Sequence, residues 1–201
     1  GSNGKTVVKE WLYQLLSPEK NVTRSPRSYN SQIGVPLSVW NLDERSEVGL
    51  FEAGISEPGE MEALQSVIQP TIGVFTCLGD AHQENFTSYE QKCLEKLKLF
   101  KDAKVLVYDM DDARVVGCVN RSAFKGEYFA WSRQRRDVPL YIASVEKREA
   151  ETVVSYIYKG KEAACSIPFI DEASLANSVS CLAVCLHLGM SPETIAARMA
   201  V

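Results

Sequence analysis

Short apolar runs alternate with amphipathic segments along the first half of the chain. Three runs have the length and continuity of buried strands: residues 48–51, 72–78 and 105–108. Three segments carry apolar side chains at helical spacing: residues 7–15, 58–68 and 88–100. A continuous apolar run is typical of a parallel strand that is covered on both faces. The alternation therefore predicts an α/β fold, with helices flanking a mostly parallel, doubly wound sheet.

The pattern changes near residue 127, where short strands and turns replace the alternation. The predicted strands are residues 128–131, 140–142, 152–158 and 163–167. The last two are separated by Lys159-Gly160-Lys161, a hairpin turn signal. We interpret this region as a small antiparallel β subdomain that flanks the main sheet.

Two helices are predicted at the end of the chain. Residues 172–188 are small and apolar on one face and stop at Gly189, and Ser191-Pro192 has the composition of a helix start. Because the chain ends inside this last helix, we expect it to be one domain of a longer polypeptide.

The first candidate for chemistry is the segment Gly1-Ser2-Asn3-Gly4-Lys5-Thr6, directly before the first helix. It matches the second half of a phosphate-binding loop, G-x-x-x-x-G-K-[ST], and implies a sheet of the P-loop type. In such a loop the backbone N–H groups face the phosphates, the lysine reaches the outer phosphates and the hydroxyl holds Mg²⁺. A buried strand normally precedes the loop, so we expect one before Gly1. A glycine-rich helix start without a ligand is the alternative.

Two further candidates follow predicted strands, where ligands collect in open α/β sheets. Glu52 comes after the run 48–51, and a carboxylate near a phosphate loop suits Mg²⁺, which prefers oxygen ligands. His82 lies in an acidic loop after the run 72–78. The alternatives are an ordinary acid in a turn and a structural histidine. The polar residues 21–32 read as a loop that could carry binding groups.

Composition narrows the class of protein. A net charge of −4 over 201 residues, without a basic stripe, argues against nucleic-acid binding. The six cysteines lack C-x-x-C spacing, which favours reduced thiols over a disulfide framework. No apolar run approaches the ~20 residues that span a bilayer, and no signal peptide is visible. We therefore expect a cytoplasmic protein without membrane insertion.

Four stretches, taken in order, resemble the central ATPase domain of the Mur ligase family. They are residues 1–6, Ile33-Gly34-Val35-Pro36, Phe51-Glu52-Ala53-Gly54, and the His82 loop followed by Lys96 and Phe100. The resemblance covers nearly the whole chain. Within the family it is strongest to the ligases that join D-alanyl-D-alanine to UDP-N-acetylmuramoyl-tripeptide. Residues 25–30 and 171–174 further suggest the form that some bacteria fuse to an alanine racemase.

The resemblance implies a role for individual residues. ATP would be bound by residues 1–6 and Asn177, with Lys5 on the β- and γ-phosphates. Mg²⁺ would be held by Thr6, Glu52, His82 and Lys96, and the catalytic set would be Lys5, Lys96 and His82. Lys96 would act as a carbamate formed with CO₂, because a carbamate offers oxygen atoms to Mg²⁺. Asn30 would contact the UDP-sugar peptide.

Two lysines share the helical segment 88–100 with Lys96. On pattern alone, Lys92, Lys96 and Lys98 are all expected in solvent. If Lys96 has the role that the resemblance implies, its helix must turn it towards the metal site, away from Lys92 and Lys98.

The sequence also departs from the family pattern. The usual histidine-asparagine before the closing helix is Ala173-Ser174, which puts the adenine contacts in doubt. The usual paired asparagine is Asn30 followed by Ser31.

The chemistry implied is activation of a carboxylate as an acyl phosphate, followed by attack of an amine. The N-terminal domain that grips UDP and the C-terminal domain that brings the amine would lie elsewhere in the polypeptide, so we expect this segment alone to be inactive. Another Mur-superfamily ligase, of the tripeptide-forming or folylpolyglutamate type, is an alternative. A P-loop nucleotide-binding module without ligase activity is the other.

Overall fold

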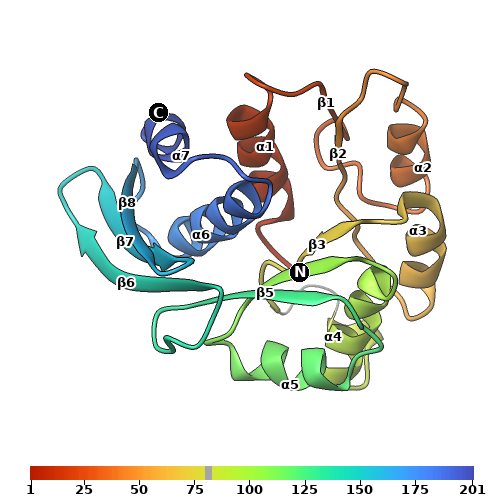
Figure 1. Cartoon of the computed structure of the whole chain (residues 1–201). Coiled ribbons are helices and arrows are strands. Elements are labelled where there is room, and N and C mark those ends of the chain that lie inside the picture. The colour runs from red at the N-terminus through yellow and green to blue at the C-terminus, as the bar shows by residue number, and fades with distance from the viewer. Residues whose placement is uncertain (80–82) are drawn as a thin grey trace.

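A computed structural model describes residues 1–79 and 83–201 and contains one six-stranded sheet (Figure 1). Its strands are β3 (Ile72–Val74), β4 (Val105–Asp109), β5 (Glu127–Ser132), β6 (Leu140–Lys147), β7 (Thr152–Tyr158) and β8 (Lys161–Ile167). They lie in the order β3-β4-β5-β6-β7-β8. The first four are parallel to one another, and β7 and β8 continue the sheet in antiparallel fashion.

Two short strands form a second, separate sheet. β1 (Val22–Arg24) pairs in parallel with β2 (Val48–Leu50), and Val22 lies opposite Val48. Residues of β2 and of β3 line the same cavity, so the two sheets face each other across it. No strand of the described residues pairs with both sheets.

Helices cover both faces of the main sheet. On one face lie α1 (Lys5–Leu16), α6 (Glu172–His187) and α7 (Pro192–Met199), and on the other α4 (Tyr89–Leu97) and α5 (Ala113–Arg121) (Figure 1). The strand β4 shows why two faces are buried. Val105 and Val107 belong to the core under α1 and α6, while Leu106 and Tyr108 belong to the core under α4 and α5. The doubly wound parallel sheet predicted from the sequence is thus confirmed.

The remaining helical elements are short, and most of them pack against the core under α4 and α5. They are α2 (Gly34–Val39), α3 (Glu60–Ile68) and two short 3₁₀ turns, η1 (Gln83–Asn85) and η2 (Lys98–Phe100). Local capping fixes several helix starts, because a side-chain oxygen there satisfies backbone N–H groups that the first turn leaves free. Ser88, Asp112, Asp171 and Ser191 each accept such a bond at the start of α4, α5, α6 and α7.

The structure differs from the sequence prediction in several places. The polar segment 21–32 was expected to be a loop but contains β1, and the helices α2 and α5 were not predicted. Within the apolar run 72–78, only Ile72–Val74 is a strand. The antiparallel strands do not form a separate subdomain, because β6 pairs in parallel with β5 and extends the main sheet. None of the helices in the described ranges is long and apolar enough to cross a membrane.

Candidate functional site

The loop 1–6 is anchored on the segment that follows β3. The backbone N–H of Ser2 donates to the carbonyl of Cys77 at 2.7 Å, and the Ser2 hydroxyl donates to the carbonyl of Gly79 at 3.1 Å. The hydroxyl of Thr76 donates to the carbonyl of Asn3 at 2.5 Å. These bonds place the loop at the carboxyl edge of the parallel sheet, where ligands bind in folds of this type.

Lys5 and Thr6 open helix α1 directly after this loop. The Lys5 ammonium folds back and donates to the carbonyls of Gly1, at 3.2 Å, and Ser2, at 3.0 Å. Burial lowers the pKa of Lys5, and the negative charge of Glu52 opposes that shift. Thr6 is half-buried in the first turn of the helix. The N-terminus of α1 therefore presents a cation, a hydroxyl and free backbone N–H groups, which together suit phosphate.

Gly4 packs tightly against helix α6. Its φ is +80°, a left-handed conformation that favours glycine, and a Cβ at this position would lie 2.3 Å from Oδ1 of Asn177. Asn177, 173 positions away in the sequence, therefore contacts the loop that it was expected to join in binding ATP. Ala173 and Ser174 lie in the first turn of the same helix, where Asp171 caps the backbone N–H of Ser174.

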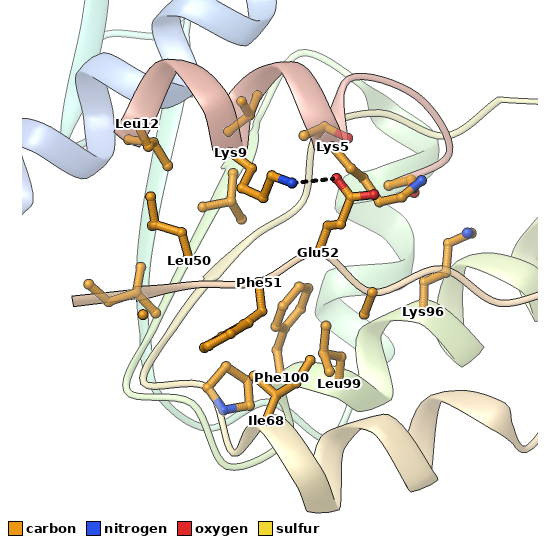
Figure 2. Close-up of a pocket in the computed structure, with 18 of the residues that line it drawn as sticks. Lys5, Lys9, Leu12, Leu50, Phe51, Glu52, Ile68, Lys96, Leu99 and Phe100 are labelled. Carbon is orange, nitrogen blue, oxygen red and sulfur yellow. Dashed lines mark hydrogen bonds and ion pairs between the residues drawn. The ribbon is translucent and has the colours of Figure 1, made fainter. Parts of the chain in front are cut away.

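Glu52 follows β2 and is buried, with 4% of its surface exposed. Its Oε1 accepts a hydrogen bond of 2.8 Å from Nδ2 of Asn30, while its Oε2 has no hydrogen-bond partner among the described residues. The nearest cation to Oε2 is the Lys9 ammonium at 3.9 Å, which is an ion pair too long for a hydrogen bond (Figure 2). A buried carboxylate oxygen that lacks a donor is suited to a cation from solution.

Lys96 lies on α4 and lines the same cavity as Glu52 (Figure 2). It is 5% exposed and its ammonium makes no hydrogen bond to residues in the described ranges. Burial, and then the like charges of Lys5 and Lys92, lower the pKa of Lys96 to about 8. The structure thus brings Lys5, Glu52 and Lys96 together around one cavity.

The expectation that Lys92, Lys96 and Lys98 all lie in solvent is wrong for two of them. Lys92 is fully buried and donates to the carbonyl of Gly79 at 2.5 Å, and Lys96 is buried one turn later. Lys96 does not turn away from Lys92, because the two are four residues apart on the same buried side. Only Lys98 reaches solvent, where it pairs with Glu95 at 2.8 Å.

Two neighbouring cavities share this chemistry. The first has a volume of about 130 Å³ and is lined by Lys5, Lys9, Glu52 and Lys96 together with apolar side chains of β2 and β3. The second has a volume of about 320 Å³ and also contains Lys5 and Lys96, with Asn30 on its wall. A substrate in the second cavity would lie between the phosphate-binding loop and the loop that carries Asn30.

Some predicted site residues are not tested by this geometry. His82 lies outside the described residues. Within the described ranges, no three His, Cys, Asp or Glu side chains gather to hold a metal. Lys9 and Lys92 were missed by the sequence reasoning, although each lies four residues from a predicted site lysine, on the same helix face.

Comparison with known proteins places this geometry in a wider context. The family model described as "Mur ligase middle domain" matches residues 1–185. The UDP-N-acetylmuramoyl-tripeptide–D-alanyl-D-alanine ligase of Borreliella burgdorferi is 30% identical over 97% of this chain and 42% of its own length. MurF from Acinetobacter baumannii superposes with a TM-score of 0.88 at 21% identity, over 99% of this chain and 44% of that one. MurF from Thermotoga maritima, solved in complex with ADP, gives 0.83 at 25% identity, over 98% and 46% of the two chains. The chain thus spans about two fifths of the length of the curated relative.

Proposed function

Because this chain belongs to the Mur ligase family, we propose that it is the ATP-binding central domain of a ligase that joins D-alanyl-D-alanine to UDP-N-acetylmuramoyl-tripeptide. One observation carries the proposal: Ser2 and Lys5 of the loop, Lys96, and Asn30, which bonds Glu52, line one cavity beside the carboxyl edge of the sheet. The two substrates are those in the name of the Borreliella burgdorferi relative. ADP in the Thermotoga maritima structure supports a nucleotide on this fold.

The residues present fit Mg²⁺ beside the phosphates. Glu52 offers a buried carboxylate oxygen that no donor among the described residues reaches, and Thr6 offers a hydroxyl at the start of α1. We assign both to the metal, with His82 as a further ligand from the family pattern. Bound Mg²⁺ would neutralise charge that develops on the transferred phosphoryl group.

Lys96 fits a carbamate. At pH 7 a lysine with a pKa of about 8 is roughly 10% neutral, against about 0.03% for an ordinary lysine, and only the neutral amine attacks CO₂. The carbamate would replace a buried cation by an anion beside Lys5 and Lys92, and its oxygen atoms would suit Mg²⁺.

The reaction would proceed in two transfers. The γ-phosphoryl group passes from ATP to an oxygen of the substrate carboxylate, which gives an acyl phosphate and ADP. The amine of the second substrate then attacks the acyl carbon, and inorganic phosphate leaves as the amide forms. Lys5 would hold the outer phosphates, Asn177 would support the loop from α6, and Asn30 would orient the carboxylate substrate from the wall of the second cavity.

Further parts of the polypeptide would complete the enzyme. The slot between β2 and β3 is lined by Gly49, Leu50, Ile72 and Val74, and an extended segment preceding Gly1 would pair there with both edges. Helix α2 and the residues at its two ends expose three apolar side chains at helical spacing: Ile33 at 75%, Leu37 at 60% and Trp40 at 88%. We assign this stripe to contact with a flanking domain. Fusion to an alanine racemase stays a prediction from residues 25–30 and 171–174.

The test is Glu52→Gln in the whole protein. The change keeps the shape and the hydrogen bond from Asn30 but removes the charge on the carboxylate. We expect ligase activity to fall at least about 100-fold. In calorimetry, the factor by which Mg²⁺ lowers the Kd for ADP should be at least about ten times smaller in the variant than in the wild type. The matched control is Glu162→Gln on the exposed surface of β8.

Two outcomes would count against the proposal. If Mg²⁺ strengthens ADP binding equally in the wild type and in Glu52→Gln, Glu52 is not a metal ligand. If the wild-type protein binds ADP but forms no amide from the two substrates, the chain belongs to a nucleotide-binding module or to a ligase for other substrates.

A further inference from the structure

Lys9 is a buried lysine that the phosphate-binding motif does not explain. It lies one turn after Lys5 on α1, and only 4% of its surface is exposed. A lysine is rarely buried unless its ammonium is paired, because removing the charge from water is costly. The buried ammonium of Lys9 must therefore be compensated by other groups, and its contacts identify them.

The Lys9 ammonium contacts two segments, the loop after β1 and the residue after β2. It donates to the carbonyl of Ser25 at 2.7 Å and also to the carbonyl of Arg27. It forms ion pairs with Glu10 at 3.3 Å and with Glu52 at 3.9 Å. One side chain of α1 thus holds the backbone after β1 and faces the carboxylate after β2 (Figure 2).

The segment held by Lys9 leads directly to Asn30. Arg27 has a φ of +47°, an uncommon conformation for a residue with a side chain, and its carbonyl is one of those that Lys9 binds. Three residues later, the carbonyl of Asn30 accepts from the N–H of Gly54 at 2.7 Å, and its side chain donates to Glu52 at 2.8 Å. The loop 25–30 therefore closes a ring of contacts from α1 through Asn30 to Glu52 and back to Lys9.

We propose that Lys9 is a positioning residue, which fixes the loop carrying Asn30 and the Glu52 carboxylate relative to the phosphate-binding helix. Lys9 acts through the backbone carbonyls that it binds and through Glu52. It thereby sets the distance between Asn30, which would orient the carboxylate substrate, and Lys5, which would hold the phosphate to be transferred. In transfer reactions of this kind, small errors in such a separation cost large factors in rate.

The consequences for substrate binding rest on the proposed function, whereas the hold on the loop does not. The first measurement is hydrogen–deuterium exchange of the whole protein without substrate, on wild type, Lys9→Met and the control Lys161→Met. Methionine keeps the length and removes the ammonium, and Lys161 is an exposed lysine of β8. We expect exchange in residues 27–31 and at Gly54 to quicken at least about tenfold in Lys9→Met alone, because charge-assisted bonds to that loop are lost.

The second measurement separates positioning from general stability. In Lys9→Met, the KM for the UDP-linked substrate should rise about tenfold while the Kd for ADP without Mg²⁺ changes less than about twofold. Asn30→Ala should raise the same KM, and the double variant should be no worse than the poorer single variant, because Lys9 acts through Asn30. If Lys9→Met does not fold, Lys9→Gln, which keeps two N–H donors, is used in its place.

Each result decides something. Unchanged exchange in residues 27–31 overturns the proposal whatever the enzyme does. Additive effects of Lys9→Met and Asn30→Ala, or equal losses in KM and in ADP affinity, would show a purely structural lysine. A protein without ligase activity but with loop exchange that depends on Lys9 would leave the positioning intact and refute only the assignment of the reaction.

Discussion

Replacing Lys96 by methionine should stabilise the folded chain at neutral pH, although it removes a residue of the site. Lys96 is almost fully buried and makes no hydrogen bond within the described part of the chain, so its charge is poorly compensated. Burial first, and the charges of Lys5 and Lys92 after it, lower the pKa of Lys96 from 10.5 to about 8. Folding therefore works against the protonated form.

The size and sign of the effect follow from that shift in pKa. A difference of about 2.5 units corresponds to roughly 3 kcal/mol of unfolding free energy at about 1.4 kcal/mol per unit. The cost is fully present below pH 8, where both states hold the proton. Between pH 8 and 10.5 the unfolded chain keeps the proton that the folded chain has lost, so the stability of the wild type rises with pH. The advantage of Lys96→Met should thus fall from roughly 3 kcal/mol at pH 7 towards zero near pH 10.5.

Urea unfolding between pH 7 and pH 10, in buffer freed of CO₂, measures this difference. The control is Lys98→Met, at the residue directly after α4. This change should not stabilise the fold, because Lys98 is partly exposed and pairs with Glu95 and Glu62. Lys92→Met removes one of the charges that lower the pKa of Lys96, and should therefore move the pH window upwards. Adding bicarbonate near pH 8 should stabilise the wild type but not Lys96→Met if a carbamate forms. The reasoning would be refuted if Lys96→Met were no more stable than the wild type at pH 7. It would also be refuted if the difference in unfolding free energy between the two did not change with pH.

Two further substitutions test the packing around the site. Gly4→Ala should lower the unfolding free energy by about 1–2 kcal/mol for the left-handed backbone alone, and by a further amount because the new Cβ displaces Asn177. Adding Asn177→Ala should recover only the second part. Full recovery in a urea-unfolding double-mutant cycle would show that alanine does not strain the backbone at position 4. Trp40→Ser should change the unfolding free energy of residues 1–201 by less than about 0.5 kcal/mol, as an exposed substitution does, but should lower the Tm of the whole protein. Equal Tm values would show that no domain covers the stripe on α2.

Most of the helices, namely α1, α3, α4, α6 and α7, could be predicted from the sequence because their signals are local. Apolar spacing and capping residues such as Ser88 and Ser191 act within a few residues of the chain. The strand β1 was missed for the opposite reason. Its three half-buried residues become a strand only by pairing with β2, which begins 24 residues after the end of β1. Helix α5 was missed although its cap, Asp112, lies in a visible acidic turn, since only Val115, Cys118 and Val119 are buried on it.

The sequence could indicate which residues belong to the site, but it could not show how those residues are arranged in space. The motif and the strand ends pointed to Lys5 and Glu52, and the resemblance to Lys96. Sequence periodicity could not show that Lys92 and Lys96 are buried, because a lysine looks the same in solvent and in a core until its surroundings are known. The bond between Asn30 and Glu52 joins residues 22 positions apart, a relation that no local pattern contains.

The close contact between Gly4 and Asn177 couples the position of helix α6 to the phosphate-binding loop. From Asn177 to His187 the helix axis is about 15 Å long at 1.5 Å per residue, and the inner face of the helix is buried. A tilt of roughly 5° about its far end would move Asn177 by about 1.3 Å, and Asn177 is already packed closely against Gly4. Motion where α6 passes into α7 would therefore be felt at the phosphate-binding loop, so a force applied far from the nucleotide could still open or tighten its cradle.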